Sequence, residues 1–580
     1  MLMNEKELLS DNIISYVTKR NWDKLKPSIE GKLMSGANKC LSKRSVIPFE
    51  YLMCRDNVPF VKSFVSLVHA QQWKICDVMF TLVNNILAEK GMSQKPHVIR
   101  FLSTIKFSYI SDLKVRLPDD EIDILGVLYQ SLMFEGERNV KGAYYTPYYI
   151  TYNMTKGLDF SSGQTILDPC CGSGAFFFPL HDVQPEQIFG LDNDPVAVML
   201  AKTNLILKYP DVIFDPQIFC FDYLKDDVIR EKKFTYIVSN PPWGAVTDVR
   251  YFDTGISSKE IFIHFFIKSF HHLENNGLLR FLMPNAVLNV RYHKELRRFM
   301  LENGNLSNIF FYNGNFSGVM TKYVDVTLKN MPSEEFVSVS DKEKIQLISK
   351  RHFYGYPNFV FNVLSSVDRE IIDKIKDKGQ LSLEKSEWAL GIVTGDNKHK
   401  LKDVREDGFE PVFTGKEISK YVLMPCKKFL LYQRDSFQQV AKDEYYRANE
   451  KLVYKFISKR LVFAYDNNRR LFLNSANILI PHVDGMSVKT VMAFLNSEVM
   501  QYYYSSLFGD VKVLKCNLLE LPFPLMTKSL DNKIVKLVDN VVSGDFSAIQ
   551  RIQNIIYNVY GLTPSQRRYI HSSNMRNKLL

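Results

Sequence analysis

Apolar residues recur at the three-and-four spacing of amphipathic helices over the first 135 residues of the chain. The spacing is clearest in residues 60–90, FVKSFVSLVHAQQWKICDVMFTLVNNILAEK, and in residues 121–135, EIDILGVLYQSLMFE. We therefore expect residues 1–135 to form an N-terminal helical region.

The pattern changes after position 142, where short apolar runs rich in β-branched residues begin to alternate with amphipathic segments. The amphipathic segments follow Pro195 and Lys259. Strand and helix in alternation predict a parallel sheet with helices on both faces, which is a doubly wound, Rossmann-like α/β fold. The predicted strands are QTILDP (164–169), QIFGLD (187–192), QIFCFD (217–222), FTYIVSN (234–240) and LLRFLMP (278–284).

The alternation stops near residue 330. The next 190 or so residues mix short strands, turns and helices, which predicts a mixed α+β region before a last helical stretch. The chain is therefore expected to contain four parts, with residues 1–135 helical, 136–330 α/β, 331–525 α+β and 526–580 a helical tail.

Composition excludes several classes of protein. With 46% hydrophobic and 24% charged residues, the chain is neither disordered nor collagen-like. No apolar run approaches the ~20 residues of a membrane-spanning helix, and the acids in MLMNEKELLSDN do not fit a signal peptide. The eight cysteines form no CxxC pair, which argues against a zinc ribbon or a disulfide scaffold and favours a reducing cytoplasm.

Basic residues exceed acidic ones, 74 against 63, for a net charge of +11. Such an excess on a soluble chain favours a polyanionic partner, most often nucleic acid. It is concentrated in residues 451–470, with six basic residues and one acid, and in residues 551–580, with five basic residues and no acid.

The first candidate for chemistry is the loop DPCCGSGAF at 168–176, between a strand and a helix. Its glycines let the backbone turn tightly and approach a ligand closely. Doubly wound sheets bind cofactors at such strand ends, although a plain turn is the alternative. The adjacent Cys170 and Cys171 are expected to pack this loop rather than to bind a metal.

Acidic residues follow the next two strands. Asp192 lies about 20 residues beyond the loop, where an acid can accept hydrogen bonds from both hydroxyls of a ribose. Asp194 stands directly before Pro195 and is expected to cap the next helix. Asp222, in CFDYL, can accept the exocyclic amine of an adenine, with a solvated turn as the alternative.

The most specific motif is SNPPWG at 239–244. Two prolines fix the backbone, so the side-chain oxygen of Asn240 and the carbonyl of Pro241 form a rigid pair of acceptors for an NH2 group. Trp243 offers a flat face on which a planar base can stack. A purely structural Pro-Pro turn is the alternative.

In this order and spacing, the motifs DPCCGSGAF, GLDNDP, CFDYL and NPPW resemble those of class I S-adenosylmethionine-dependent methyltransferases that modify exocyclic amino groups. GAYYTP at 142–147 resembles the motif that precedes the cofactor loop in adenine-N6 DNA methyltransferases, and the large region after the catalytic half is similar to the gamma class of bacterial restriction–modification systems. GIVTGDN (391–397), LNS (495–497) and LPFP (521–524) resemble their target-recognition domain. The resemblance makes 136–330 the catalytic domain and 331–525 the DNA target-recognition domain.

The resemblance also implies a role for each matching residue. S-adenosylmethionine is expected to contact Thr146, Pro147, Asp168, Gly172, Gly174, Asp192, Asn193, Asp222 and Tyr223. The target base is expected to contact Asn240, Pro241, Pro242 and Trp243. Phe316 is the expected second stacking aromatic, with Met320 or Tyr323 as alternatives.

We therefore expect a site-specific adenine-N6 DNA methyltransferase that acts on a base flipped out of double-stranded DNA, in the cytoplasm of a bacterial or archaeal cell. This reaction requires no metal, and we expect no membrane association and no obligate protein partner. The resemblance implies a cognate restriction endonuclease as functional partner. The alternatives are a methyltransferase of an amine or amide in RNA or protein, and a non-catalytic DNA-specificity protein.

Residues 451–470 are expected to form part of the DNA-facing surface of the recognition domain. In a helix, Lys455, Lys459 and Arg460 would cluster on one side. Arg469 and Arg470 follow a predicted turn, which would project them outward. A solvated helix face is the alternative.

Overall fold

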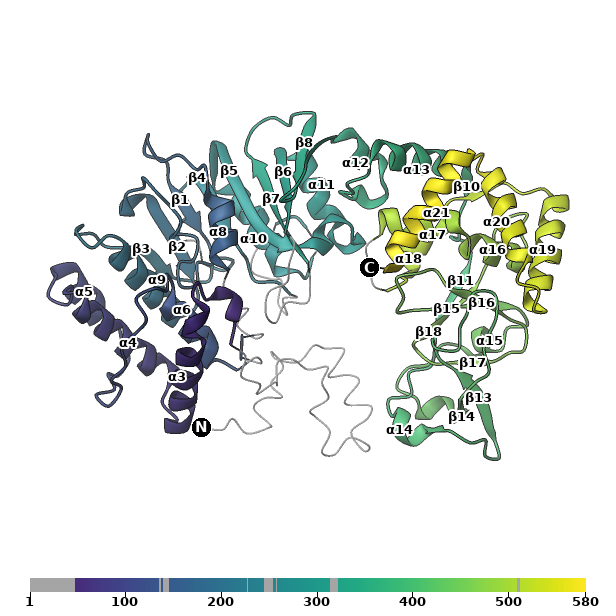
Figure 1. Cartoon of the computed structure of the whole chain (residues 1–580), viewed down its shortest axis with the longest axis horizontal. Helices are drawn as coiled ribbons and strands as arrows, with labels where there is room; N and C mark the ends of the chain where they lie inside the picture. Colours follow the sequence, from purple (N-terminus) through teal and green to yellow (C-terminus); the bar gives the residue numbers. More distant parts are fainter. Residues whose placement is uncertain are drawn as a thin grey trace. The chain divides into compact units, whose positions relative to one another are not determined.

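The computed structural model describes residues 47–134, 137–138, 146–226, 228–244, 254–256, 258–312, 322–508 and 512–579. This part of the chain divides into two compact units, whose elements are labelled in Figure 1. The first unit contains residues 47–287 and Tyr292–Gly355, and the second contains Leu288–Arg291 and residues 356–579. None of the described helices combines the length and the apolar character that crossing a bilayer requires.

The first unit is built on one nine-stranded sheet. Its strands are β1 (Ile166–Asp168), β2 (Ile188–Asp192), β3 (Gln217–Cys220), β4 (Phe234–Ser239), β5 (Leu273–Pro284), β6 (Asn305–Phe311), β7 (Tyr323–Lys329), β8 (Phe336–Ser340) and β9 (Ile345–Ser349). They lie in the order β3-β2-β1-β4-β5-β7-β6-β8-β9. The neighbours from β3 to β5 are parallel, whereas β7 runs antiparallel to both β5 and β6. The predicted doubly wound α/β fold is confirmed.

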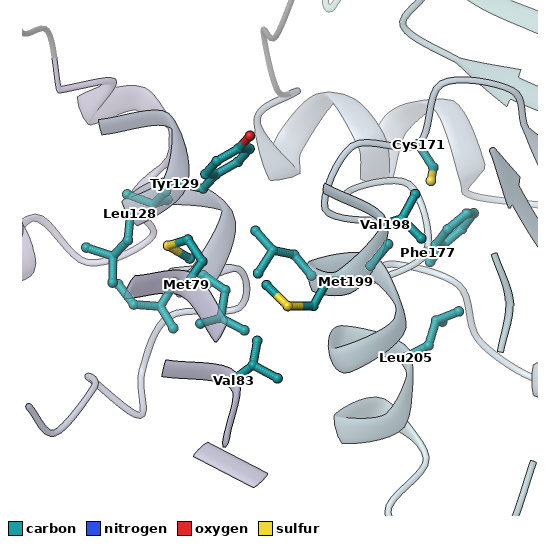
Figure 2. Close-up of a cluster of buried hydrophobic side chains, with 14 of the residues drawn as sticks. Met79, Val83, Leu128, Tyr129, Cys171, Phe177, Val198, Met199 and Leu205 are labelled. Atoms are coloured by element: carbon teal, nitrogen blue, oxygen red, sulfur yellow. The ribbon is translucent and has the colours of Figure 1, made fainter. Parts of the chain in front are cut away.

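Some helices of this unit contact the sheet and others pack on those helices (Figure 1). The described helices are α3 (Val58–Gln71), α4 (Ile75–Glu89), α5 (Pro96–Ser103), α6 (Ile124–Leu132), α8 (Tyr148–Thr155), α9 (Pro195–Lys208), α10 (Ile261–His271), α11 (Lys294–Glu302) and α12 (Arg351–Gly355). The helices α4 and α6, from the predicted N-terminal helical region, pack against α9, and α6 is buried along its whole length. Figure 2 shows Met79, Leu128 and Met199 of α4, α6 and α9 in their shared cluster. The N-terminal helices thus share one core with the sheet.

The sheet continues past residue 330, where the sequence predicted a change of domain. The strand β8 pairs with β6, and β9 pairs with β8 at the sheet edge. The first unit ends only at Gly355. Because no helix separates β7, β8 and β9, the strand–helix alternation that marked the earlier strands is absent from this stretch.

The second unit contains two four-stranded sheets and several helices. The first sheet has the order β11 (Glu387–Leu390), β18 (Ala476–Ile480), β15 (Lys451–Lys455), β16 (Phe463–Asp466), and the second has β12 (Leu401–Lys402), β14 (Lys428–Leu431), β13 (Phe409–Phe413), β17 (Leu471–Phe472). A two-stranded ribbon joins β10 (Gly379–Leu381) and β19 (Phe523–Pro524). The helices are α13 (Ser366–Lys378), α14 (Asn397–Lys400), α15 (Asp443–Tyr446), α16 (Val488–Leu495), α17 (Glu498–Leu507), α18 (Lys515–Leu518), α19 (Lys528–Val542), α20 (Ala548–Val559) and α21 (Pro564–Leu579).

The helix that would have clustered Lys455, Lys459 and Arg460 does not form. Residues 451–470 instead contain the antiparallel hairpin of β15 and β16, in which Lys451 lies opposite Asp466. The strand β15 is buried from Lys451 to Tyr454, so both of its faces are covered and its apolar residues do not alternate with polar ones. Without that alternation, the four-residue spacing of the lysines suggested a helix.

The hairpin contains a fully buried ion pair, in which Lys451 Nζ lies 2.6 Å from Asp466 Oδ2. Burial lowers the pKa of Lys451, and the carboxylate of Asp466 opposes that effect. Removing one member of such a pair leaves the other charge in the core without its counterion.

We expect Asp466→Ala to lower the free energy of unfolding by roughly 3–5 kcal/mol, because Lys451 would lose its buried partner. The matched control is Asp484→Ala, which breaks the exposed Lys385–Asp484 pair of 2.9 Å and should cost no more than about 1 kcal/mol. Thermal and urea unfolding of both variants measures the difference. Equal losses of stability in the two variants would contradict the prediction that breaking the buried ion pair is more destabilising than breaking the exposed one.

Candidate active site

The loops that follow β1, β2, β3 and β4 meet at the carboxyl edge of the sheet. Because β1 lies between β2 and β4, the strand order reverses at β1 and β4. Doubly wound sheets bind ligands in the crevice at such a reversal. The loop DPCCGSGAF leaves β1 on one side of it, and the NPPW segment leaves β4 on the other.

Two glycines of the β1 loop have left-handed backbone conformations, with φ of 54° at Gly172 and 89° at Gly174. A Cβ atom is disfavoured there, so glycine permits the tight turn that the motif predicted. The amide of Cys171 donates to the Leu191 carbonyl at 2.8 Å, which ties the loop to β2. The loop is thus held against the neighbouring strand.

Asp168 ends β1 and is buried. Its Oδ1 accepts hydrogen bonds from the Cys170 amide at 3.1 Å and from Ser239 Oγ at 2.6 Å. Burial raises the pKa of Asp168 to about 7, although both hydrogen bonds act in the opposite direction. The Ser239 contact links the end of β1 directly to the end of β4.

Asp192, at the end of β2, is half-buried and uses both carboxylate oxygens. Its Oδ2 accepts from the Gly172 amide and its Oδ1 from the Asp194 amide, each at 2.9 Å. Burial raises the pKa of Asp192 to about 6. A carboxylate offers about four acceptor positions, so these two bonds leave capacity for ligand hydroxyls.

The predicted cap is confirmed, because Asp194 Oδ1 accepts from the Val196 amide at 2.9 Å at the start of α9. Asn193, between the two acids, is exposed at the same edge. These three residues thus separate into a capping acid, an exposed amide and the crevice-facing Asp192.

Asp222 and Tyr223 both follow β3, but their side chains differ in solvent exposure. Asp222 is partly exposed, with its Oδ2 3.0 Å from Lys225 Nζ. The Tyr223 ring is packed in the core with only 3% of its surface exposed, and its hydroxyl forms a 3.1 Å hydrogen bond with Ser269 of α10. The structure therefore brings Asp222 to this edge and does not bring the Tyr223 ring there.

The NPPW segment is joined to two other elements. Asn240 Nδ2 donates to Thr146 Oγ1 at 3.1 Å, which turns the amide nitrogen toward Thr146 and the amide oxygen away from it. Cys170 Sγ lies 3.0 Å from Ser239 Oγ and 3.5 Å from the Asn240 carbonyl. Pro241 is buried, while Pro242 and Trp243 are half-buried.

Of the GAYYTP motif, Thr146 and Pro147 lie within the described residues and the first four do not. Pro147 directly precedes α8. A cavity of about 30 Å³, room for a water molecule or two, lies between Thr146, Asp123 of the α6 N-terminus and Ala175 of the β1 loop. Thr146 therefore lies beside the β1 loop and is hydrogen-bonded to Asn240 of the NPPW segment.

The second stacking aromatic is not settled by the described residues, because Phe316 and Met320 lie outside them. Tyr323 lies within them and is buried. Its ring stacks on Tyr312 at 5.4 Å and its hydroxyl forms a 2.9 Å hydrogen bond with Tyr149. Tyr323, at the start of β7, therefore packs on Tyr312 and Tyr149, and the choice among the three candidates stays a prediction.

The five basic residues expected to face DNA lie in the second unit. Lys459 and Arg469 are exposed, and Lys455, Arg460 and Arg470 are half-buried. Three of them make contacts within the chain that the predicted helix and turn did not include. Arg460 donates to the Asn574 carbonyl at 3.3 Å, Arg469 Nε to Asn449 Oδ1 at 3.0 Å, and Arg470 to Asp466 Oδ1 at 3.4 Å.

Sequence reasoning assigned no role to Ser239 and did not place Asp123 or Tyr129 in this region. Ser239 stands directly before the NPPW motif, so its position was a usable signal. Asp123 caps α6 with Gly126 three residues later, a common start of a helix that says nothing of a distant contact. Tyr129 lies on an apolar helix face, and nothing in the neighbouring sequence indicated that its hydroxyl contacts the β2 loop.

Two solved structures share this fold. The Type IIL restriction-modification enzyme MmeI, solved in complex with DNA, superposes with a TM-score of 0.56 and 13% identity, over 97% of this chain and 99% of that one. The DrdV–DNA complex gives a TM-score of 0.57 and 10% identity, over 84% of this chain and 71% of that one. At these identities the likeness establishes the fold alone.

The sequence matches two family descriptions in chain order, "N-6 DNA Methylase" over residues 120–378 and "TaqI-like C-terminal specificity domain" over residues 410–523. The Type II methyltransferase M.VspI of Vibrio sp. (strain 343) is 30% identical over 311 residues, which are 51% of this chain and 75% of that protein. The Type I restriction enzyme MjaIX methylase subunit of Methanocaldococcus jannaschii is 27% identical over 52% of this chain and 55% of that protein. From the extent of these matches, the chain belongs to the N-6 DNA methylase family and carries a TaqI-like C-terminal specificity domain.

Proposed function

We propose that the chain transfers a methyl group from S-adenosylmethionine to N6 of an adenine flipped out of duplex DNA, as the modification enzyme of a restriction–modification system. Adenine-specific DNA methylation follows from membership of the family. The proposal adds that S-adenosylmethionine is the cofactor, that the target adenine is flipped out, and that a cognate endonuclease is the functional partner. The observation that carries it is a pair of hydrogen bonds at the reversal of strand order, from Ser239 to Asp168 at the end of β1 and from Asn240 to Thr146.

The residues at the strand ends fit S-adenosylmethionine. Three carboxylates follow three adjacent strands, and each suits one part of the cofactor, with Asp168 holding the methionine amine, Asp192 the ribose hydroxyls and Asp222 the adenine amine. Asp222 is paired with Lys225, but Asp168 and Asp192 are desolvated, and desolvated carboxylates favour a ligand that brings positive charge. Thr146 and Pro147 flank the methionine end, beside Gly172 and Gly174 of the β1 loop, and Asn193 lies against the adenine.

The chain's own residues act on the target amine, whereas the cofactor, when bound, supplies the methyl group as an electrophile. Asn240 Oδ1 and the Pro241 carbonyl accept the two amine hydrogens, which localises the lone pair on the adenine nitrogen. Pro242 keeps these acceptors rigid and Trp243 stacks on the base. Catalysis is therefore mainly positioning, together with stabilisation of the positive charge that develops on nitrogen.

The alternative substrates are disfavoured by the second unit. The specificity-domain match at residues 410–523 accounts for a large region that an RNA or protein methyltransferase would not need. A non-catalytic specificity protein would not need the contacts that hold Asn240 against Thr146 beside the β1 loop.

We expect Asn240→Ala to abolish methyl transfer while the affinity for S-adenosylhomocysteine stays within about threefold, because the amide contacts the base and not the cofactor. The contrasting variant is Asp192→Ala, which should weaken S-adenosylhomocysteine binding by about 10- to 150-fold through lost hydrogen bonds to a charged group. Labelled-cofactor transfer to DNA, RNA and protein, with calorimetric titration, measures both. Near-normal transfer by folded Asn240→Ala would overturn its role, and labelled RNA or protein would redirect the substrate. Sequencing modified bases in cells that express the chain tests the site specificity.

Stability without cofactor should depend on pH through the buried acids. The pKa of Asp168 in the folded chain is about 7, well above its value of about 4 in an unfolded chain. Between these two pKa values, Asp168 binds more protons in the folded chain than in the unfolded chain. The contribution of Asp168 to the free energy of unfolding is therefore fully present below about pH 4 and is lost as pH rises through about 7.

We expect Asp168→Asn to raise the free energy of unfolding of the cofactor-free protein at pH 8 by roughly 1–4 kcal/mol, because an amide carries no charge to bury. The same variant should bind S-adenosylhomocysteine more weakly. Unfolding curves between pH 4 and 8, with and without the ligand, measure both effects. A variant less stable than wild type at pH 8, or one with unchanged affinity, would count against the assigned ionisation and role.

DNA contact by the second unit should appear in the salt dependence of binding. If Lys459 meets a phosphate, Lys459→Ala should reduce the slope of log K against log salt by about 0.9. Arg469→Ala could instead relax sequence preference, if its guanidinium reaches a guanine edge. The control is Lys90→Ala, an exposed lysine of the first unit paired with Asp119. Unchanged slope and discrimination in both second-unit variants would exclude this part of the hairpin from the DNA surface.

A further inference from the structure

The helix α6 belongs to the N-terminal helices, yet it contacts both loops assigned to the cofactor. We infer that α6 is a positioning element of the cofactor site, in which Asp123 holds the β1 loop and Tyr129 holds the β2 loop. This inference rests on the proposed function, since it concerns how the same site is kept ready for S-adenosylmethionine.

Asp123, the N-cap residue of α6, joins three segments of the chain. Its Oδ2 accepts a short hydrogen bond from Ser173 Oγ in the β1 loop. Its Oδ1 accepts from the Gly126 amide of α6 and from Asn204 Nδ2 of α9, each at 3.0 Å. Asn204 also donates to the Ser173 carbonyl at 2.9 Å, so that the β1 loop is held by both its side chain and its backbone.

Tyr129 makes the corresponding contact with the β2 loop. Its buried hydroxyl donates to Asp194 Oδ2 at 2.5 Å. The Asp194 amide in turn donates to Asp192 Oδ1, the acid assigned to the ribose. Figure 2 shows Tyr129 beside Leu128 on α6, with Met199 of α9 across the cluster. Tyr129 is therefore connected to Asp192 through Asp194 and does not itself contact Asp192.

The spacing of the two contacts along α6 allows one helix to hold both loops at once. Tyr129 lies six positions after Asp123, which is about 9 Å along a helix axis. The loops that they hold leave the adjacent parallel strands β1 and β2. Because all of α6 is buried, the helix cannot shift without disturbing the core around it.

Gly126 permits the approach of α6 to the β1 loop. A Cβ atom at this position would lie 2.3 Å from Asp123 Oδ2 and 2.6 Å from Ser173 Oγ, too close for either. Glycine weakens a helix by about 1 kcal/mol relative to alanine, so its presence here is disadvantageous to α6 alone. The contact between Asp123 and Ser173 explains why a glycine occupies the first turn.

The test compares Tyr129→Phe and Asp123→Asn with Tyr209→Phe. Tyr209 also loses one hydroxyl hydrogen bond, 3.0 Å to the Val183 carbonyl, but lies at the far end of α9. We expect the α6 variants to bind S-adenosylhomocysteine about 10-fold more weakly, as the loss of a hydrogen bond to a charged group predicts. The KM for S-adenosylmethionine should rise similarly, while kcat and the KM for DNA change by less than about threefold. Tyr209→Phe should leave all four quantities unchanged.

Amide hydrogen exchange of Gly172 and Gly174 in the cofactor-free protein provides a second readout. Exchange should be faster in both α6 variants than in wild type and Tyr209→Phe. Gly126→Ala should weaken S-adenosylhomocysteine binding even though alanine favours the helix, which keeps the test decisive if Asp123→Asn does not fold. Lower thermal stability with unchanged affinity and exchange would overturn the inference. Wild-type protein that fails to bind S-adenosylhomocysteine would refute the proposed function instead, and the exchange comparison would still decide what α6 does.

Discussion

The hydrogen bond between Ser239 and Asp168 fixes the distance between the two halves of the site. These residues end the neighbouring parallel strands β4 and β1, at the point where the strand order reverses. One loop leaves each strand end, so the bond determines where the glycines of the β1 loop stand relative to Asn240. Because the bond is buried, water cannot replace it without opening the sheet edge. Cys170 reinforces it through contacts with Ser239 and the Asn240 carbonyl.

The same junction carries a cost that is typical of binding sites. Asp123, Asp168 and Asp192 are all desolvated, and burial raises the pKa of each above the ordinary range of an aspartate. A fold selected only for stability would place uncharged side chains at such positions. The three acids lie at or beside the ends of β1 and β2, so the unfavourable burial of charge is concentrated where a cationic ligand is proposed to bind.

The sequence allowed the local features of this site to be predicted. The five first strands, the cap at Asp194 and the order of the motifs depend on short stretches such as SNPPWG, whose backbone is restricted by its own residues. The features that were not predicted depend on partners far along the chain. Lys451 and Asp466 become interpretable only when paired across a hairpin, Tyr223 turns toward Ser269, and β8 joins a sheet whose earlier strands ended before residue 330. No periodicity within a window of 10 or 20 residues contains such contacts.

The position of α6 also defines the smallest unit that could be moved intact between proteins. The recognisable motifs begin at residue 142, and a fragment cut there would keep every loop of the crevice but lose Asp123 and Tyr129. The match to the N-6 DNA Methylase description begins at residue 120, three residues before Asp123. If α6 positions the two loops as inferred, a catalytic half transplanted into another protein should therefore begin upstream of α6.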